Sequence, residues 1–462
     1  MAECTKPAMP GSGVCPGQTT GRVILDDAVA LVRGDRFLSY DFNSSTLTNW
    51  GASKLGSLPS GAYGGMLPQL LFRGLPGGFT GTSTYALLPF YTPQAAKDIL
   101  KGNKVVEQYD LERPPSDREL VGIHTQEGCK KVSEDREHFR VMSQAAIRNC
   151  TDGHDFMIGW DEAKRHDHRS AILHKVFFEE GFEAKASKFF STNTAHLIKQ
   201  NSLKYAKTTR ILETHLKTQQ GFKEHVADWM TKGSAYEVGP EADRIYHALN
   251  KTGSSTGDLV GDCIGMGAPV AGNLTQQASL LIDLFLSEGY EQYRERIVEL
   301  AHKDDATSER ELQGFMFEGM RHAGVVPRLP RVAANDITIM DGARGPVHIK
   351  AHQTVLVVTS KAAMDPVAFP DPQKLDPHRP FSAYNLLGHG LHYCFGAKLV
   401  GCSLAATLRE VFKLKNLRRA PGRLGRFSTV EHEITGVKMM HYLDANAKES
   451  PIPTTLTLMY DE

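Results

Sequence analysis

Apolar side chains recur every three to four residues over most of the chain beyond residue 117. This spacing predicts amphipathic helices, because it gathers the apolar side chains on one face of each helix. Residues 258–286 are apolar on most faces, which predicts a long, buried central helix. The other predicted helices cover residues 139–150, 161–182, 184–205, 212–230, 310–322 and a last segment from Gly396 to about Lys413.

Strand signals are fewer and shorter. Residues 336–358 contain apolar runs on both sides of the turn Asp-Gly-Ala-Arg-Gly-Pro, which predicts a β-hairpin. Residues 1–91 are rich in Gly, Ser and Thr and show no pattern that would form a core of its own. Because Pro114 and Pro115 interrupt any helix, we place a domain boundary near residue 107. The pattern predicts a mainly α protein with small β-sheets.

Composition narrows the class of protein. Lys and Arg together number 53, as do Asp and Glu, and this balance argues against nucleic-acid binding. No run of 18 apolar residues is present, so we expect no membrane span. The N-terminus lacks the apolar core of a secretory signal, and seven irregularly spaced cysteines do not indicate a disulfide framework. We therefore expect a cytoplasmic protein.

The strongest chemical feature is the segment Leu-Gly-His-Gly-Leu-His-Tyr-Cys-Phe-Gly, in which Cys394 precedes the last predicted helix. Amides at a helix N-terminus favour negative charge, so we expect them to lower the pKa of Cys394 and stabilise its thiolate. Gly390 and Gly396 would let a large planar cofactor approach the backbone closely. A thiolate held in this way suits an axial ligand of haem iron.

Two other interpretations of this segment remain open. Cys394 alone is equally compatible with a buried, inert cysteine. His389, His392 and Cys394 lie within six residues and could bind zinc, although the sequence offers no obvious further ligands.

The central helix carries a second unusual feature. Pro269 cannot donate a backbone hydrogen bond and should kink the helix, and Gly272 leaves room for a ligand. Asn273 and Gln276 are three residues apart, so they share a helix face. Their amides can bind a hydroperoxide without supplying a charge, or can instead form hydrogen bonds between helices in a core.

The segment around Cys394 resembles the haem-binding loop of the cytochrome P-450 superfamily, with Leu387 where Phe is usual and His392 where Arg is common. Three further elements follow the order of that family. They are the Glu-x-x-Arg of residues 318–321, the Phe/Pro/Arg segment of residues 369–380 and the basic helix segment His-Asp-His-Arg of residues 166–169.

The resemblance implies the cytochrome P-450 fold with haem b as the cofactor. It makes Cys394 the axial ligand of the iron, with Gly390 and Gly396 beside the cofactor. Glu318, Arg321 and Arg379 are expected to form a buried ion network. The residues expected to contact the haem propionates are Arg169, Arg331 and His392.

The central helix also departs from the usual pattern of the superfamily. Oxygen-activating members read Ala-Gly-x-Asp/Glu-Thr, whereas this chain has Leu274 at the acidic position, followed by Thr275. A leucine cannot relay protons, which favours a substrate that already carries its O–O bond. The pattern resembles the haem-thiolate domain of fungal fatty-acid dioxygenase fusion enzymes, the linoleate diol synthases and psi-producing oxygenases.

The resemblance extends to both ends of the chain. Residues 14–50 and 85–104 look like the end of the helical, peroxidase-type dioxygenase domain of that family, so residues 1–107 are interpreted as its C-terminal remnant. Residues 108–462 then form the haem-thiolate domain. The interval between Arg169 and Asn273 is short for the superfamily, which suggests that intervening material is missing near residues 208–213.

The implied function is the rearrangement of linoleate-derived fatty-acid hydroperoxides to diols or allene oxides in oxylipin biosynthesis. Asn273 would position the peroxide, with Thr275 and Gln276 as further catalytic candidates, and the Cys394 thiolate would promote O–O cleavage. A separate dioxygenase would supply the substrate, and no reductase is required. The alternatives are a reductase-dependent monooxygenase and an inactive haem-binding remnant or fragment.

Overall fold

The computed structural model describes residues 121–141, 156–204, 209–215, 240–269, 273–351, 353–434, 437–443, 447, 449–450 and 455–462. The proposed dioxygenase remnant, residues 1–107, lies outside this part of the chain, as do Gly272 and most of the helix predicted at residues 139–150.

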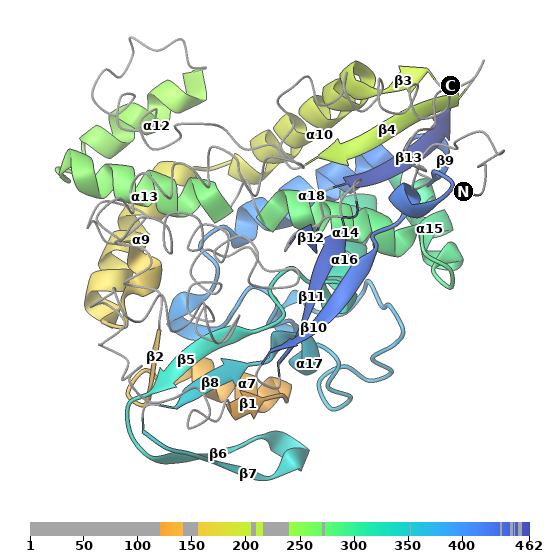
Figure 1. The fold of residues 1–462 in the computed structure, drawn as a ribbon. Helices are drawn as coiled ribbons and strands as arrows, with labels where there is room; N and C mark the ends of the chain where they lie inside the picture. Colours follow the sequence, from red (N-terminus) through yellow and green to blue (C-terminus); the bar gives the residue numbers. More distant parts are fainter. Residues whose placement is uncertain are drawn as a thin grey trace.

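Helices dominate the described residues (Figure 1). The longer ones are α7 (Gln126–Glu134), α9 (Ala163–Phe177), α10 (Phe182–Asn201), α12 (Pro240–Asn250), α13 (Thr256–Pro269), α14 (Thr275–Phe285), α15 (Glu291–Ala301), α16 (Ala306–His322) and α18 (Ala397–Phe412). The short helix α17 (Thr359–Ala362) follows the last strand of the sheet that lies beside α7.

Within the described residues the strands form four small sheets, which agrees with the small β-sheets that the sequence predicts. The first has the order β1 (Val121–Ile123), β8 (Thr354–Val357), β5 (Leu329–Ala333) and β2 (Phe139–Val141). The second has the order β3 (Leu203–Lys204), β4 (Thr209–His215), β13 (Thr455–Asp461) and β9 (Lys415–Arg419). The others are the sheet of β10 (Thr429–Ile434), β11 (Val437–Leu443) and β12 (Glu449–Ser450), and the hairpin of β6 (Ile337–Met340) and β7 (Pro346–Ile349).

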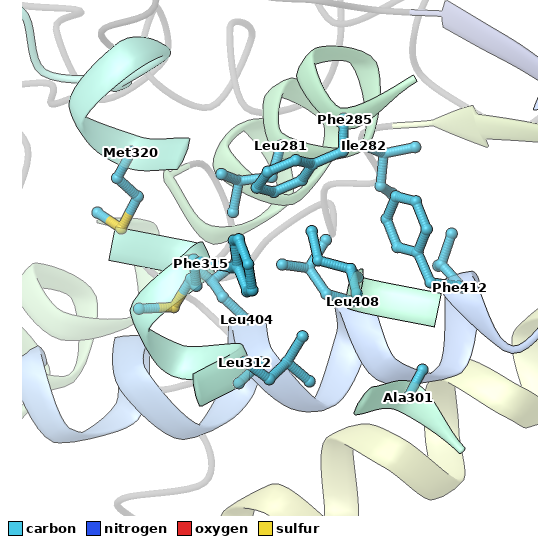
Figure 2. Close-up of a cluster of buried hydrophobic side chains, with 14 of the residues drawn as sticks. Leu281, Ile282, Phe285, Ala301, Leu312, Phe315, Met320, Leu404, Leu408 and Phe412 are labelled. Atoms are coloured by element: carbon cyan, nitrogen blue, oxygen red, sulfur yellow. The ribbon is translucent and has the colours of Figure 1, made fainter. Parts of the chain in front are cut away.

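The main core lies between α14, α15, α16 and α18. Figure 2 shows Phe285, Phe315 and Phe412 converging on leucines of α16 and α18. The helix α16 begins at this core because the Asp305 carboxylate accepts hydrogen bonds from the amides of Thr307 and Ser308, at 3.0 and 2.9 Å. The central helices and the cysteine loop are therefore built on one packed scaffold.

Two predicted helices are wrong where the structure describes them. Residues 139–141 form strand β2, with Phe139 and Val141 buried and Arg140 exposed, and residues 209–215 form strand β4. Strand β4 pairs with β13 over seven residues, so Leu212 lies opposite Leu458. Short apolar runs suit either structure, and pairing with a distant strand decides between them.

The sequence predicts a kink at Pro269 in the central helix, and residues 270–272 lie outside the described part of the chain. Helix α13 ends at Pro269, Asn273 and Leu274 form a π-helical turn, and α14 begins at Thr275. The predicted hairpin is confirmed for β6 and β7. The segment after it was expected to continue the same strand, but β8 instead joins the sheet of β1 and β5.

The predicted ion network is also confirmed. Glu318 and Arg321 are one helix turn apart on α16, and both side chains are fully buried. The Arg321 guanidinium donates to both carboxylate oxygens of Glu318, at 3.0 and 2.7 Å, while Arg379 Nε lies 3.6 Å from Glu318 Oε1. Arg321 also donates to backbone carbonyls of the segment that leads to the cysteine loop.

Candidate cofactor site

Cys394 lies between the short 3₁₀ helix η9 (Gly390–His392) and α18. Its backbone amide donates to the Leu387 carbonyl at 2.7 Å, which closes the loop, and its own carbonyl accepts from Ala397 at 3.1 Å. The last turn of the loop thereby leads directly into α18. This places the Cys394 side chain at the N-terminus of a sixteen-residue helix, as the sequence predicts.

The electrostatics of this thiol differ from the expectation. Burial raises the pKa of Cys394, and a hydrogen bond from the Gly396 amide lowers it by a smaller amount. Helix amides alone therefore do not produce a thiolate here. A bound cation would reverse this balance, because a coordinating thiol is deprotonated by the charge of the metal.

The glycines of the loop serve its packing against α7. Gly388 and Gly390 have φ values of +80° and +66°, a region that L side chains rarely adopt. A Cβ at Gly390 would lie 3.0 Å from the carbonyl oxygen of Ser133, the second-last residue of α7. His389 fastens the same junction, because its Nε2 lies 2.6 Å from Glu134 Oε1.

The zinc interpretation fails for the described residues. His389 pairs with Glu134 on α7, whereas His392 points toward Asp161, with Nε2 3.5 Å from Oδ1. Within the described ranges, no group of three histidine, cysteine or acidic side chains is arranged to hold a metal ion.

Three basic side chains converge beside the cysteine loop. His392 comes from η9, Arg331 from β5 and His166 from α9, and all three side chains are largely buried. The rings of His166 and His392 meet edge to face, with their centroids 5.5 Å apart. Asp161 is the carboxylate that acts on both Arg331 and His392. We call His166, Arg331, His392 and Asp161 the basic cluster.

The basic cluster places the Arg331 guanidinium and the His392 ring beside the Asp161 carboxylate, while His166 also lies beside Asp167, with Nδ1 3.1 Å from Oδ1. Burial lowers the pKa of Arg331 to about 10 and also lowers that of His392. Neither ring nitrogen of His392 has a hydrogen-bond partner among the described residues. Because buried charges and buried polar atoms require partners, this cluster fits a ligand that carries carboxylates. The propionates of haem have this chemistry.

Arg169 does not join the cluster. It forms a buried ion pair with Asp262 on α13, and its Nη1 donates to Ser254 Oγ at 2.6 Å. The residue of α9 that faces His392 is His166, one turn earlier, which the sequence analysis placed in the basic segment but not among the propionate contacts. Residues 166 and 169 both look basic and helical in the sequence, and only the packing of α9 shows which of them faces the loop.

Two polar side chains of the central helix, Asn273 and Gln276, carry buried atoms without hydrogen-bond partners among the described residues. Gln276 is 1% exposed, yet neither of its amide atoms has a hydrogen-bond partner among the described residues, and the same is true of Asn273 Oδ1. Gln277, by contrast, binds the Ala323 carbonyl and the Val325 amide and so secures α14 to the end of α16. The side chain of Thr275 is not among those described.

Comparison with solved structures decides the fold. Rif16 aligns with a TM-score of 0.53 and 16% identity, over 74% of this chain and 90% of its own. CYP109E1 from Bacillus megaterium aligns with a TM-score of 0.52 and 15% identity, over 77% and 98% of the two chains. This chain has the cytochrome P450 fold. Residues 310–397, from α16 to the cysteine loop, match the Cytochrome P450 family. That family and fold imply a haem iron with a thiolate ligand.

Curated relatives of this P450-fold chain are fungal oxygenases. Psi-producing oxygenase A of Emericella nidulans is 28% identical over 543 residues, which cover 100% of this chain and 50% of the relative. The bifunctional dioxygenase–epoxy alcohol synthase of Fusarium oxysporum is 26% identical over 100% of this chain and 42% of its own length. The 7,8-linoleate diol synthase of Pyricularia oryzae is 22% identical over 93% of this chain and 50% of its own length. The chain is thus similar to these fungal proteins and spans about half their length or less.

The alignments are also longer than the chain. They extend over 543 residues, whereas the chain has 462, so the relatives carry residues in the aligned region that have no counterpart here. None of the described helices has the length and hydropathy that a membrane span requires.

Proposed function

We propose that this chain is a haem-thiolate enzyme that rearranges fatty-acid hydroperoxides, of the linoleate-derived type, to diols or allene oxides in oxylipin biosynthesis. The observation that carries the proposal is the basic cluster beside the Cys394 loop, in which the buried side chains of Arg331 and His392 share one carboxylate, Asp161. The names of the homologues, which include a diol synthase and an epoxy alcohol synthase, support this class of substrate.

In this proposal Cys394 holds the iron of haem b, with Gly396 as the residue that donates to its sulfur. Arg331 and His392 bind the propionates, and His166 takes the place that the sequence suggested for Arg169. The contribution of Gly390 is the close contact of the loop with α7. When bound, the haem supplies the iron centre at which the O–O bond of the peroxide is cleaved.

The side chains of the central helix orient the substrate. The amides of Asn273 and Gln276 provide hydrogen-bond donors for the peroxide oxygens, and Thr275 offers a hydroxyl from the next helix position. Leu274 supplies no proton, so the helix lacks the acid that dioxygen activation uses. The reaction requires no external electrons, because the substrate itself is the oxidant, and we propose that no reductase takes part.

We also propose that residues 1–107 derive from the end of a dioxygenase domain and that a separate dioxygenase supplies the hydroperoxide. Residues 108–462 then form the P450 domain. The regular pairing of β4 shows that residues 209–215 form an intact strand. The greater length of the alignments supports a domain that is shortened relative to its homologues.

The test is incubation of the purified full chain, loaded with haem, with linoleate hydroperoxides in the absence of NADPH. Chiral analysis should reveal diols, allene oxide products or epoxy alcohols. Cys394→Ser should abolish the ferrous–CO spectrum of a thiolate-bound haem, and Asn273→Leu should retain that spectrum but slow peroxide cleavage. No turnover despite a normal spectrum would refute the proposed activity and favour the inactive remnant. Turnover only with oxygen and a reductase would favour the monooxygenase.

A further inference from the structure

Helices α9 and α13 are joined by a buried ion pair that no part of the proposed chemistry uses. The pair consists of Arg169 on α9 and Asp262 on α13, whose side chains are 11% and 2% exposed. Both termini of the Arg169 guanidinium are engaged, because Nη2 donates to Asp262 Oδ2 and Nη1 donates to Ser254 Oγ. The Asp262 carboxylate and the Ser254 hydroxyl therefore hold both ends of the one guanidinium that α9 extends toward α13.

The hydroxyl partner is itself held by the turn that precedes α13. Thr252 Oγ1 lies 2.9 Å from Ser254 Oγ and 2.7 Å from the Leu249 carbonyl at the end of α12. The hydrogen-bond network thus connects α9, the turn between α12 and α13, and α13 itself. Such shared networks couple the positions of the elements that they join.

The position of α9 matters because this helix also packs against the cysteine loop. His166 contacts His392, and His174 lies against Phe395, with ring centroids 4.5 Å apart. Phe395 directly follows Cys394 in the chain. Through Arg169, one turn after His166, α9 is also attached to α13, the helix that leads to the Asn273 turn.

We infer that Arg169 and Asp262 are positioning residues that fix α9 between the cysteine loop and the central helix, so that His166 is held in the basic cluster. The inference rests on the proposed function in one respect, namely that the basic cluster holds the carboxylates of the cofactor. Neither residue touches the reacting atoms in this assignment. They act through the placement of α9.

The charge balance of the pair supports a positioning role over a purely stabilising one. Burial raises the pKa of Asp262 from its ordinary value to about 6, although its hydrogen bond and charge interaction with Arg169 oppose this shift. Asp258 on the same helix raises the pKa further, and the neighbouring Cys263 is neutral because burial raises its own pKa. A carboxyl whose pKa is raised on folding lowers the stability of the fold as the pH increases toward that value. The pair therefore forms above about pH 6 at a net cost in stability.

The experiment compares Asp262→Asn with Asp283→Asn in the full chain supplied with haem. Asp283 is the matched control, because it lies on α14, in the second half of the central helix, and pairs with Arg419 of β9. Haem loss is followed by transfer to apomyoglobin, and hydrogen exchange of α9 amides is measured at pH 7.5 and pH 5.5 after correction for intrinsic rates. We expect Asp262→Asn to accelerate haem loss and α9 exchange on the order of tenfold at pH 7.5, and Asp283→Asn to leave both unchanged.

A double variant covers the case in which Asp262→Asn folds poorly. Arg169→Met combined with Asp262→Leu removes both charges, so no unpaired charge remains buried. We expect it to fold but to lose haem faster than the wild type, and its α9 exchange should be faster than that of the wild type at both pH values. Wild-type haem retention and wild-type α9 exchange in this variant would overturn the inference. The exchange measurement does not depend on haem, whereas failure of the proposed function is seen separately as the absence of a thiolate spectrum in the wild type.

Discussion

Removal of Arg321 should destabilise the fold more than the loss of any surface charge. In Arg321→Met the Glu318 carboxylate, which is fully buried, loses the two hydrogen bonds of 3.0 and 2.7 Å that Arg321 provides. It retains the Tyr384 hydroxyl at 2.8 Å and the Asp376 amide at 3.0 Å. Removing one partner of a buried ion pair costs about 3–5 kcal/mol, and Arg379, whose Nε lies 3.6 Å from Glu318 Oε1, offsets only part of the lost charge.

The backbone adds to this loss. Arg321 also donates to the carbonyls of Ala363, Pro372 and Lys374, at 3.1, 2.5 and 3.0 Å. These carbonyls belong to the segment between α17 and the cysteine loop, so the substitution also loosens the path to Cys394. We expect a loss of about 4 kcal/mol and a fall in Tm on the order of 10 °C.

Urea denaturation and calorimetry measure the effect. The control is Lys131→Met, which removes an exposed pair with Glu127 on α7 and should cost less than about 0.5 kcal/mol. In a double-mutant cycle, Glu318→Gln should recover more than about 1 kcal/mol of the loss, because it removes the unpaired charge. A loss below about 1 kcal/mol in Arg321→Met, or full additivity in the cycle, would refute the reasoning.

Three further outcomes follow from the structure. Gly314→Ala should destabilise α16 by several kcal/mol, because the new Cβ would lie 1.9 Å from a backbone carbonyl oxygen. The control Gly401→Ala on α18 meets no atom within 4 Å and should be neutral or stabilising, and thermal melts compare the two variants. His166→Leu should weaken haem binding about tenfold in a haem titration, whereas the control His168→Leu, at an exposed position of the same helix, should not change it. Equal effects of the two substitutions would contradict the placement of α9. Burial lowers the pKa of His322 to about 4, so as the pH falls below about 6.5 this side chain takes up a proton in the unfolded chain before it does so in the folded protein. The free energy of unfolding should therefore decline by about 2 kcal/mol between pH 6.5 and 4. In His322→Gln urea midpoints should show a smaller decline, and an unchanged slope would exclude His322 as its source.

Local patterns predicted a large part of this molecule correctly. The helix at residues 310–322, the interrupted central helix, the β6–β7 hairpin and the helix after the cysteine loop all depend on neighbouring residues. Periodicity, proline and turn residues act over a few positions, so a sequence is sufficient to reveal them. The pairing of Glu318 with Arg321 belongs to the same class, because the two residues are one helix turn apart.

What the sequence could not show are features that depend on partners far along the chain. Residues 139–141 and 209–215 became strands because β5 and β13, which are distant in sequence, accept their backbone hydrogen bonds. The choice between His166 and Arg169 depended on tertiary contacts, because His166 meets His392 of the cysteine loop whereas Arg169, one turn later, pairs with Asp262 of α13. The raised pKa of Cys394 reflects burial by the surrounding elements rather than its place at a helix N-terminus.

The sequence by itself determined the chemistry of the site, because a cysteine among glycines before a helix, and amides where an acid is usual, are visible as residue types. The tertiary structure decided which basic side chains share the buried cluster and how the helices that carry them are held. These properties depend on desolvation and on contacts between distant segments, which no local pattern contains.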